Sequence, residues 1–164
     1  MELILVLLSG AILGFVLHRA ADIIPAQYPV LNMPFPLRAW SVPAINAILF
    51  AVLWLRFDAT IQFVLTALYT LVFLIVLVID FERRIIPNVI ILPAILFAAV
   101  ASFLFPRWQL YLLGGACAFV IVFVIYIAAI LFGRLQKLSV PGGVFGQGDV
   151  TLATFMGLVT GFPA

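Results

Sequence analysis

Long apolar runs separated by short polar segments make up most of this chain. The runs predict helices over residues 3–24, 42–57, 60–79, 88–105, 109–132 and 149–164. About 20 mostly apolar residues are enough for a helix to cross the hydrocarbon core of a membrane. The run over 60–79 contains no charged residue and gives the clearest span. The pattern predicts an all-α fold, a polytopic integral membrane helix bundle with about six transmembrane helices.

The amino-acid composition supports lipid as the main solvent of the chain. Hydrophobic residues make up 67% of the 164 residues and charged residues 9%, whereas soluble domains average about 25% charged residues. A soluble domain of this size exposes much of its surface and could not hide so many apolar side chains. No basic cluster indicates nucleic-acid binding, and the single cysteine, Cys117, provides neither disulfides nor a cysteine-based zinc site. We expect no metal and no cofactor.

Small and polar residues inside the apolar runs predict where helices meet. Gly10 and Gly14 are spaced so that a second helix can approach their common face. Gly114 and Gly115 mark another close-packing point. Asn46, inside the second run, is interpreted as the source of an interhelical hydrogen bond rather than as a substrate contact.

The polar segments predict the loops. Residues 25–42 contain four prolines and are expected to form a loop outside the membrane. Residues 80–88 are expected to form a short charged loop, and residues 133–148 a polar, glycine-rich one. Pro87 suits the first turn of the following helix, because its missing N–H costs nothing there. Pro93 predicts a kink in that helix.

Charged residues at the helix ends are interpreted as facing water or the membrane interface. One group, expected to form a solvated loop face, comprises Glu82, Arg83 and Arg84. The other, expected to be interfacial rather than metal-ligating because no second ligand cluster exists, comprises His18, Arg19 and Asp22.

The distribution of lysine and arginine predicts the orientation of the chain. Two of these residues, Arg56 and Arg107, lie in the second and fourth loops. The odd-numbered loops hold Arg19, Arg38, Arg83, Arg84, Arg134 and Lys137. Positively charged loops remain in the cytoplasm, so we expect the odd loops to be cytoplasmic and the N-terminus to lie outside. The N-terminal run lacks the opening positive charge of a cleaved signal peptide and is interpreted as the first membrane helix.

Two aspartates fall on the same side of this topology. Asp80 ends the third apolar run, and Asp149 begins the sixth. Carboxylates near the apolar region usually face a bundle interior or a water-filled cavity. Two close carboxylates cannot both ionise readily, so they share one proton. The ionised partner can then activate a water against a peptide carbonyl, which the protonated partner polarises. The pair therefore predicts aspartyl-protease chemistry, provided that the third and sixth helices are neighbours.

The helix ends predict unequal roles for the two acids. A helix N-terminus favours the anion and a C-terminus disfavours it, so Asp149 is expected to be the resting base and Asp80 the resting acid. Gly146 and Gly148 lack Cβ, which allows positive φ and close backbone approach, so they are expected to admit an extended substrate strand. Taken singly, each acid also has a simpler interpretation. Asp149 would be a helix N-cap, and Asp80 an interfacial acid paired with Arg83 or Arg84.

The motifs resemble those of a known family. Gly-x-Gly-Asp at 146–149, preceded by an aspartate six residues before Ile86-Pro87-Asn88, resembles the type IV prepilin peptidases, which are membrane aspartyl proteases. The segment over residues 9–19 is also similar to the N-terminal helix of that family.

The resemblance implies a function and a site. It implies an aspartic-type endopeptidase of the bacterial inner membrane that removes the short basic leader of prepilin- or pseudopilin-like proteins at the cytoplasmic face. It implies Asp80 and Asp149 as the catalytic pair, supported by Gly146 and Gly148. Many members carry Cys-x-x-Cys pairs that bind zinc after the first helix and also methylate the new N-terminus. Residues 25–42 contain no cysteine, so neither zinc nor methyltransferase activity is expected.

The last apolar run is short for a membrane span. Residues 149–164 fall below the length needed to cross a core of about 30 Å, and the family normally continues past its Gly-x-Gly-Asp helix. We therefore expect residues 1–164 to form a single transmembrane peptidase domain that lacks its natural C-terminal helix.

Two alternatives to a peptidase stay open. One is a non-catalytic membrane scaffold or an ion- or proton-transport subunit in which the two aspartates serve a cation path. Such proteins place acids near the membrane midplane and show repeat symmetry, and neither feature is evident here. The other is an inactive relative that binds pilin-like helices without cutting them.

Overall fold

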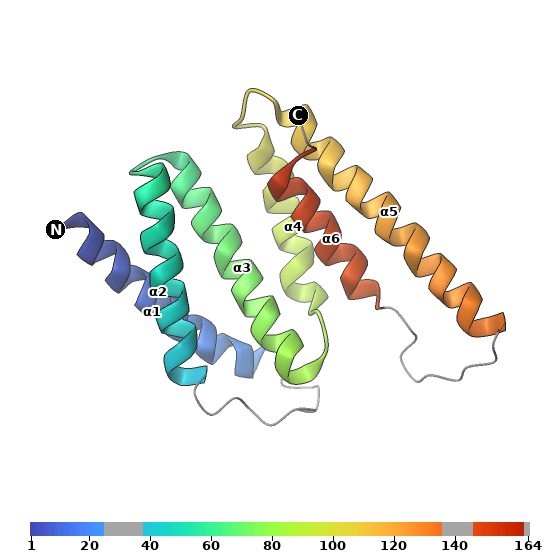
Figure 1. Ribbon diagram of the computed structural model, residues 1–164, viewed down its shortest axis with the longest axis horizontal. Helices are drawn as coiled ribbons and strands as arrows, with labels where there is room; N and C mark the ends of the chain where they lie inside the picture. The colour runs from blue at the N-terminus through green and yellow to red at the C-terminus, as the bar shows by residue number, and fades with distance from the viewer. Residues whose placement is uncertain (25–37, 136–145, 163–164) are drawn as a thin grey trace. The chain divides into compact units, whose positions relative to one another are not determined.

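The computed structural model describes residues 1–24, 38–135 and 146–162. These residues form six helices and no strand, as Figure 1 shows. The helices are α1 Glu2–Ile23, α2 Arg38–Phe57, α3 Ile61–Arg83, α4 Asn88–Ser102, α5 Trp108–Leu135 and α6 Gln147–Thr160. The predicted all-α fold is therefore confirmed. The loops expected over 25–37 and 136–145 lie outside the described residues.

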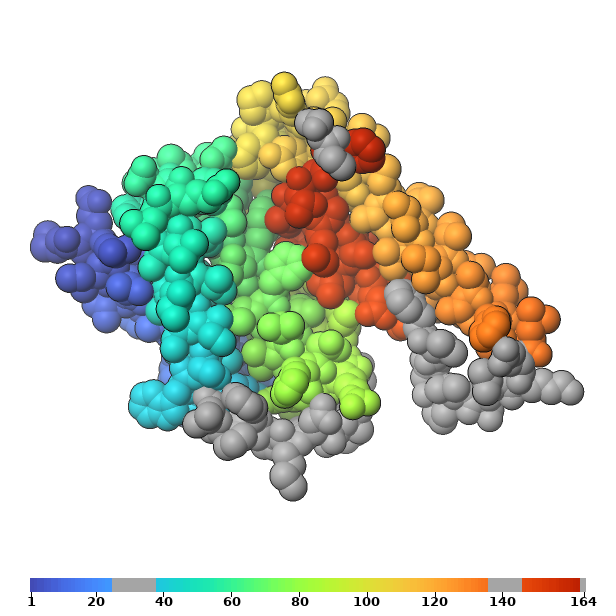
Figure 2. Space-filling view, in the orientation of Figure 1, coloured from blue at the N-terminus to red at the C-terminus, as the bar shows by residue number. Residues whose placement is uncertain are grey.

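Four of the described helices are long and apolar enough to cross a membrane: α1, α2, α3 and α5. The other two are shorter, since α4 has 15 residues and α6 has 14. Large apolar side chains remain exposed along α5, among them Val120, Val124 and Leu131. Figure 2 shows the surface of this helix in orange. Exposed apolar side chains of this kind suit contact with lipid, so the chain is a helical membrane bundle.

The chain divides into two compact units, Met1–Pro87 and Asn88–Ala164, each described by itself. In the first unit, each of α1, α2 and α3 packs against the other two. In the second unit, α6 packs against both α4 and α5. That the whole chain functions as one domain stays a prediction.

The small residues of α1 lie against α2, as their spacing predicts. A Cβ built on Gly10 would come within 2.8 Å of the Ala47 Cα, and one on Gly14 within 2.6 Å of the Pro43 Cα. Real Cβ atoms do not approach backbone atoms so closely, so this face accepts only glycine without a shift of the helices. Asn46 donates a 2.7 Å hydrogen bond from Nδ2 to the Gly10 carbonyl. The predicted interhelical hydrogen bond is confirmed.

The second glycine pair holds α6 against α5. A Cβ on Gly114 would clash with the carbonyl oxygen of Gly157, and a Cβ on Gly157 would clash with that of Gly114. Gly115 instead faces the side chain of Leu158, at 2.6 Å from a built Cβ. The predicted packing point is confirmed, and it fixes the helix that carries Asp149.

The third helix runs past its predicted end at Ile79. It continues to Arg83, so the first four residues of the expected 80–88 loop are helical. Neither glycine nor proline occurs between Ile61 and Ile86. The helix ends where Arg84 adopts the left-handed conformation at φ 54°. The residue before a proline disfavours helical geometry, which agrees with a stop near this position.

Other boundaries differ by a few residues. The second helix begins at Arg38 rather than Val42, and the fifth extends to Leu135 rather than Phe132. The fourth ends at Ser102, whereas Phe105 was expected, and it passes through Pro93 without breaking. The sixth begins at Gln147, two residues before the predicted start.

Candidate active site

Asp80 lies in the last turn of α3 and is exposed. Its main-chain carbonyl accepts a 2.7 Å hydrogen bond from the N–H of Arg84, the residue that ends the helix. The C-terminal turn of a helix carries partial negative charge. Asp80 thus lies at the kind of helix end predicted for the resting acid, and its proton assignment stays a prediction.

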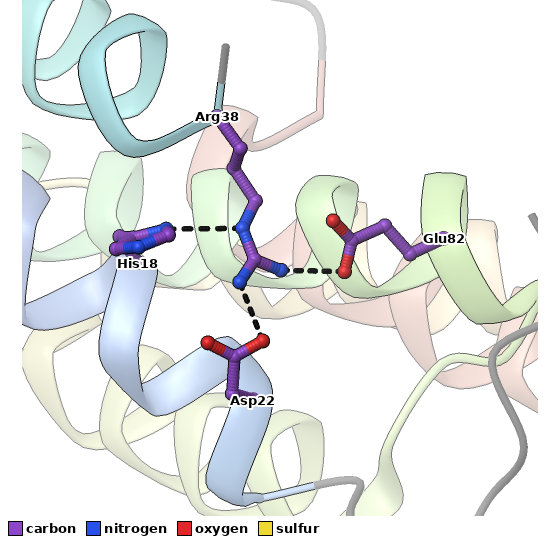
Figure 3. Close-up of polar contacts among 4 residues, drawn as sticks. All are labelled: His18, Asp22, Arg38 and Glu82. Carbon is purple, nitrogen blue, oxygen red and sulfur yellow. Dashed lines mark hydrogen bonds and ion pairs between the residues drawn. The ribbon is translucent and has the colours of Figure 1, made fainter. Parts of the chain in front are cut away.

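A cluster of four polar side chains lies at the same end of the first unit. Figure 3 shows Arg38 of α2 pointing between His18 and Asp22 of α1 and Glu82 of α3. Arg38 donates from Nη1 to Glu82 Oε2 and from Nη2 to Asp22 Oδ1, each at 2.5 Å. Its Nε donates to His18 Nδ1 at 3.0 Å. One guanidinium group thus connects the end of α1, the start of α2 and the end of α3.

This cluster corrects the expectation that these charges face water. Glu82 and Arg83 were predicted to form a solvated loop face with Arg84, but Glu82 is 2% exposed and Arg83 7% exposed. The prediction was wrong because α3 continues through both residues and turns them toward protein. Arg38, expected in a loop, is also buried. His18 and Asp22 stand one helical turn apart on α1, an i, i+4 spacing that could have indicated a shared polar face.

Asp149 lies in the first turn of α6 and is half-buried. Gly146, not Asp149, is the N-cap of the helix. The Asp149 carboxylate turns back and accepts a 3.1 Å hydrogen bond from the N–H of Gly146, which is the reach of an acidic third residue in a capping box. The simpler interpretation of Asp149 as a capping residue is therefore right in kind, with the acid inside the helix rather than ahead of it.

The two glycines before Asp149 do not use positive φ. Gly146 has φ −87° and ψ 147°, and Gly148 is part of α6. Among the described glycines, positive φ occurs at Gly161. A Cβ at position 146 would meet the Asp149 carboxylate at 3.4 Å, an ordinary van der Waals distance. The expected close approach of a substrate strand to these two glycines stays a prediction.

The two predicted catalytic acids belong to different units. Asp80 lies in Met1–Pro87 and Asp149 in Asn88–Ala164, so the structure gives each acid its own surroundings and the pairing of the two stays a prediction. Each acid occupies the predicted kind of helix end, Asp80 in a last turn and Asp149 in a first turn. No group of three or more metal-binding side chains capable of holding an ion occurs among residues 1–24, 38–135 and 146–162.

Comparisons with known proteins agree with these motifs. The profile of the type IV leader peptidase family matches residues 67–164, more than half of the chain. A prepilin leader peptidase/N-methyltransferase of Vibrio cholerae serotype O1 is 32% identical over 116 residues, which cover 70% of this chain and 43% of that protein. The chain thus spans less than half the length of this curated relative. No solved structure matches the chain. On the strength of the family match and this relative, the chain belongs to the type IV leader peptidase family.

Proposed function

We propose that this protein is a membrane aspartyl endopeptidase that removes the short basic leader of prepilin- or pseudopilin-like proteins at the cytoplasmic face of the bacterial inner membrane. One observation carries the proposal. The family match over residues 67–164 contains Asp80 and the whole Gly146–Asp149 motif. Both acids needed for the chemistry therefore lie in the part of the chain that is similar to leader peptidases.

The surroundings of each acid support a division of roles. Asp149 lies at the positive end of the α6 dipole and Asp80 at the negative end of the α3 dipole, so we assign water activation to Asp149 and polarisation of the carbonyl to Asp80. In this mechanism Asp149 takes a proton from water as the water attacks the scissile carbonyl. Asp80 donates a hydrogen bond to the carbonyl oxygen and then a proton to the leaving amine.

The proton assignment has its own test. Isotope-edited infrared spectroscopy of the free enzyme, with carboxyl bands assigned through Asp80→Asn and Asp149→Asn, would show which side chain carries the resting proton. We expect the protonated band to disappear with Asp80→Asn. The two acids share one proton as a coupled pair. If the protonated band disappears in Asp149→Asn and persists in Asp80→Asn, the roles of the two acids are reversed.

We propose the peptidase activity alone. The relative from Vibrio cholerae is named for both a peptidase and a methyltransferase. The segment between the first two helices of this chain, residues 25–37, contains no cysteine. It therefore lacks the Cys-x-x-Cys pairs that accompany the two-function members, and we expect cleavage without N-methylation.

Cleavage of a defined substrate tests the proposal. Protein reconstituted in nanodiscs would be incubated with a prepilin-like peptide that carries a basic leader and an apolar helix. Asp80→Asn and Asp149→Asn should each reduce cleavage by about 1,000-fold or more, because each removes a group that takes part in proton transfer. Asp58→Asn is the matched control, since Asp58 is an exposed aspartate in the turn before α3.

The outcomes also separate the alternatives. Normal cleavage by either dyad variant would disprove the catalytic pair. Binding of the peptide without cleavage by the parent protein would identify an inactive relative that holds pilin-like helices. Neither binding nor cleavage, together with aspartate-dependent proton flux across the membrane, would support the transport alternative.

A further inference from the structure

The polar cluster at the end of the first unit has a specific geometry. Each of the three guanidinium nitrogens of Arg38 donates to a different partner: Nε to His18, Nη1 to Glu82 and Nη2 to Asp22. Because His18 Nδ1 accepts, the ring proton of a neutral His18 sits on Nε2. The planar guanidinium fork fixes the direction of each bond. The directed bonds therefore fix the orientation of the end of α3, whereas a simple attraction between charges would not.

Burial makes the Arg38–Glu82 bond demanding. The side chains of Arg38 and Glu82 are 8% and 3% exposed, whereas that of Asp22 is 51% exposed. Two buried ions are costly to remove from water, and a pair of apolar residues of similar size often gives equal or greater stability. Stability alone is thus a weak reason for this pair, and a requirement for directed bonds is a better one.

The register of α3 connects this pair to Asp80. Successive residues of an α-helix are rotated by about 100°, so Glu82 and Asp80 project about 200° apart around the axis. Glu82 faces the buried Arg38, and Asp80 is exposed. A rotation of the last turn that released Glu82 would swing Asp80 by the same angle. The bond to Arg38 consequently sets where the Asp80 carboxyl group points.

We propose that Arg38 and Glu82 are positioning residues for Asp80, and that they act by fixing the rotation of the last turn of α3. The proposal rests on the catalytic role of Asp80 proposed above. The Arg84 cap, which bonds to the Asp80 carbonyl, limits axial slippage of the same turn. Asp22, which is half-exposed, and His18 orient the guanidinium group from the α1 side.

Paired variants separate positioning from folding. Glu82→Gln keeps the shape of the side chain and weakens the charge-assisted bond to Arg38. The double variant Arg38→Met with Glu82→Met fills the site with apolar groups, restores a satisfied interior and abolishes the directed bonds. Arg38→Lys keeps the charge but loses the fork. Arg56→Met, which removes an exposed arginine at the other end of α2, is the control for a change of charge.

The activity readout is the division between kcat and KM. Misplacing a reacting group by about 1 Å can cost about 100-fold in rate. We expect kcat to fall by about 10- to 100-fold in Glu82→Gln, Arg38→Lys and the double methionine variant. KM should stay within about 2-fold, because Arg38 and Glu82 are buried and are not expected to contact the peptide. Wild-type kcat in a double methionine variant that unfolds like the parent would overturn the proposal.

A second readout does not depend on cleavage. In a Cys117→Ser background, which removes the single native cysteine, a nitroxide would be attached to Asp80→Cys and its mobility measured by electron paramagnetic resonance. We expect Glu82→Gln and the double methionine variant to mobilise this label but not a label at Asp58→Cys. If the spectrum of the label at position 80 does not change in these variants, the positioning role is disproved, whether or not the unlabelled parent protein cleaves its substrate. If the label is mobilised in these variants but the unlabelled parent protein never cleaves the peptide, the proposed function alone fails.

Discussion

The Nδ2 of Asn46 donates to the carbonyl oxygen of Gly10 at 2.7 Å, beside a close contact of α1 with α2. The side-chain amide oxygen, Asn46 Oδ1, is buried without a hydrogen-bond partner among the described residues. Asn46→Leu removes one interhelical bond and one unsatisfied acceptor together. We expect a loss of about 1 kcal/mol, which is typical of such bonds in membrane proteins, in unfolding by SDS in mixed micelles. A loss above about 3 kcal/mol would show that Asn46 has a further partner.

The glycines of α1 should tolerate substitution much less well. Gly14→Ala places a methyl group against the backbone of Pro43, which cannot move without displacing α2. Overpacking of this kind costs about 1–3 kcal/mol, although alanine is the better helix former. Ser9→Ala, on the exposed side of the same helix, should change the unfolding free energy by less than about 0.5 kcal/mol. Equal stability of the two variants would contradict the close approach of α1 and α2.

Two adjacent glycines of α5 should differ in the same way. Gly114→Ala meets backbone at Gly157, whereas Gly115→Ala meets Cγ and Cδ2 of the Leu158 side chain, which can adjust more readily than backbone. We expect Gly114→Ala to destabilise by about 1–3 kcal/mol and Gly115→Ala by less. Leu158→Ala should relieve the second substitution and leave the first unchanged. Double-mutant cycles of thermal unfolding measure this coupling, and a cycle without coupling at Gly115 would refute the contact.

Breaking the buried ion pair should cost more than replacing it. Arg38→Met leaves Glu82 charged, buried and unpaired, at a cost of about 3–5 kcal/mol. Adding Glu82→Met should recover most of that loss, since no charge then remains buried there. Asp22→Asn should cost less than about 1 kcal/mol, because the Asp22 side chain is 51% exposed and solvent screens its charge. SDS unfolding in micelles tests all three, and a double variant weaker than Arg38→Met would contradict the argument.

Asp149→Asn should separate capping from chemistry. An asparagine oxygen can still accept from the N–H of Gly146, so the first turn of α6 should keep its circular dichroism and thermal stability. Asp149→Ala loses the bond as well and should cost about 1 kcal/mol. Both variants should lack cleavage activity under the proposed function. An asparagine variant that loses helix content would show that the cap requires the charge.

The sequence predicted the helices and their close contacts more successfully than the environment of the charges. Glycine spacing and a lone asparagine carry information about packing because few other arrangements satisfy them in lipid. Glu82 and Arg83 were assigned to water because single charged residues usually are solvated. The buried Glu82 is paired with Arg38, 44 positions away, and no local pattern encodes such a partner. The approach of Asp80 to Asp149 is long-range in the same sense and stays a prediction.

The capping bond of Asp149 has a consequence for turnover. Its Oδ2 already accepts the N–H of Gly146, so a water or a proton that engages this oxygen competes with the backbone for it. Under the proposed function, proton transfer at Asp149 would compete with this capping bond, and the entry of the chain into α6 would loosen whenever the bond is broken.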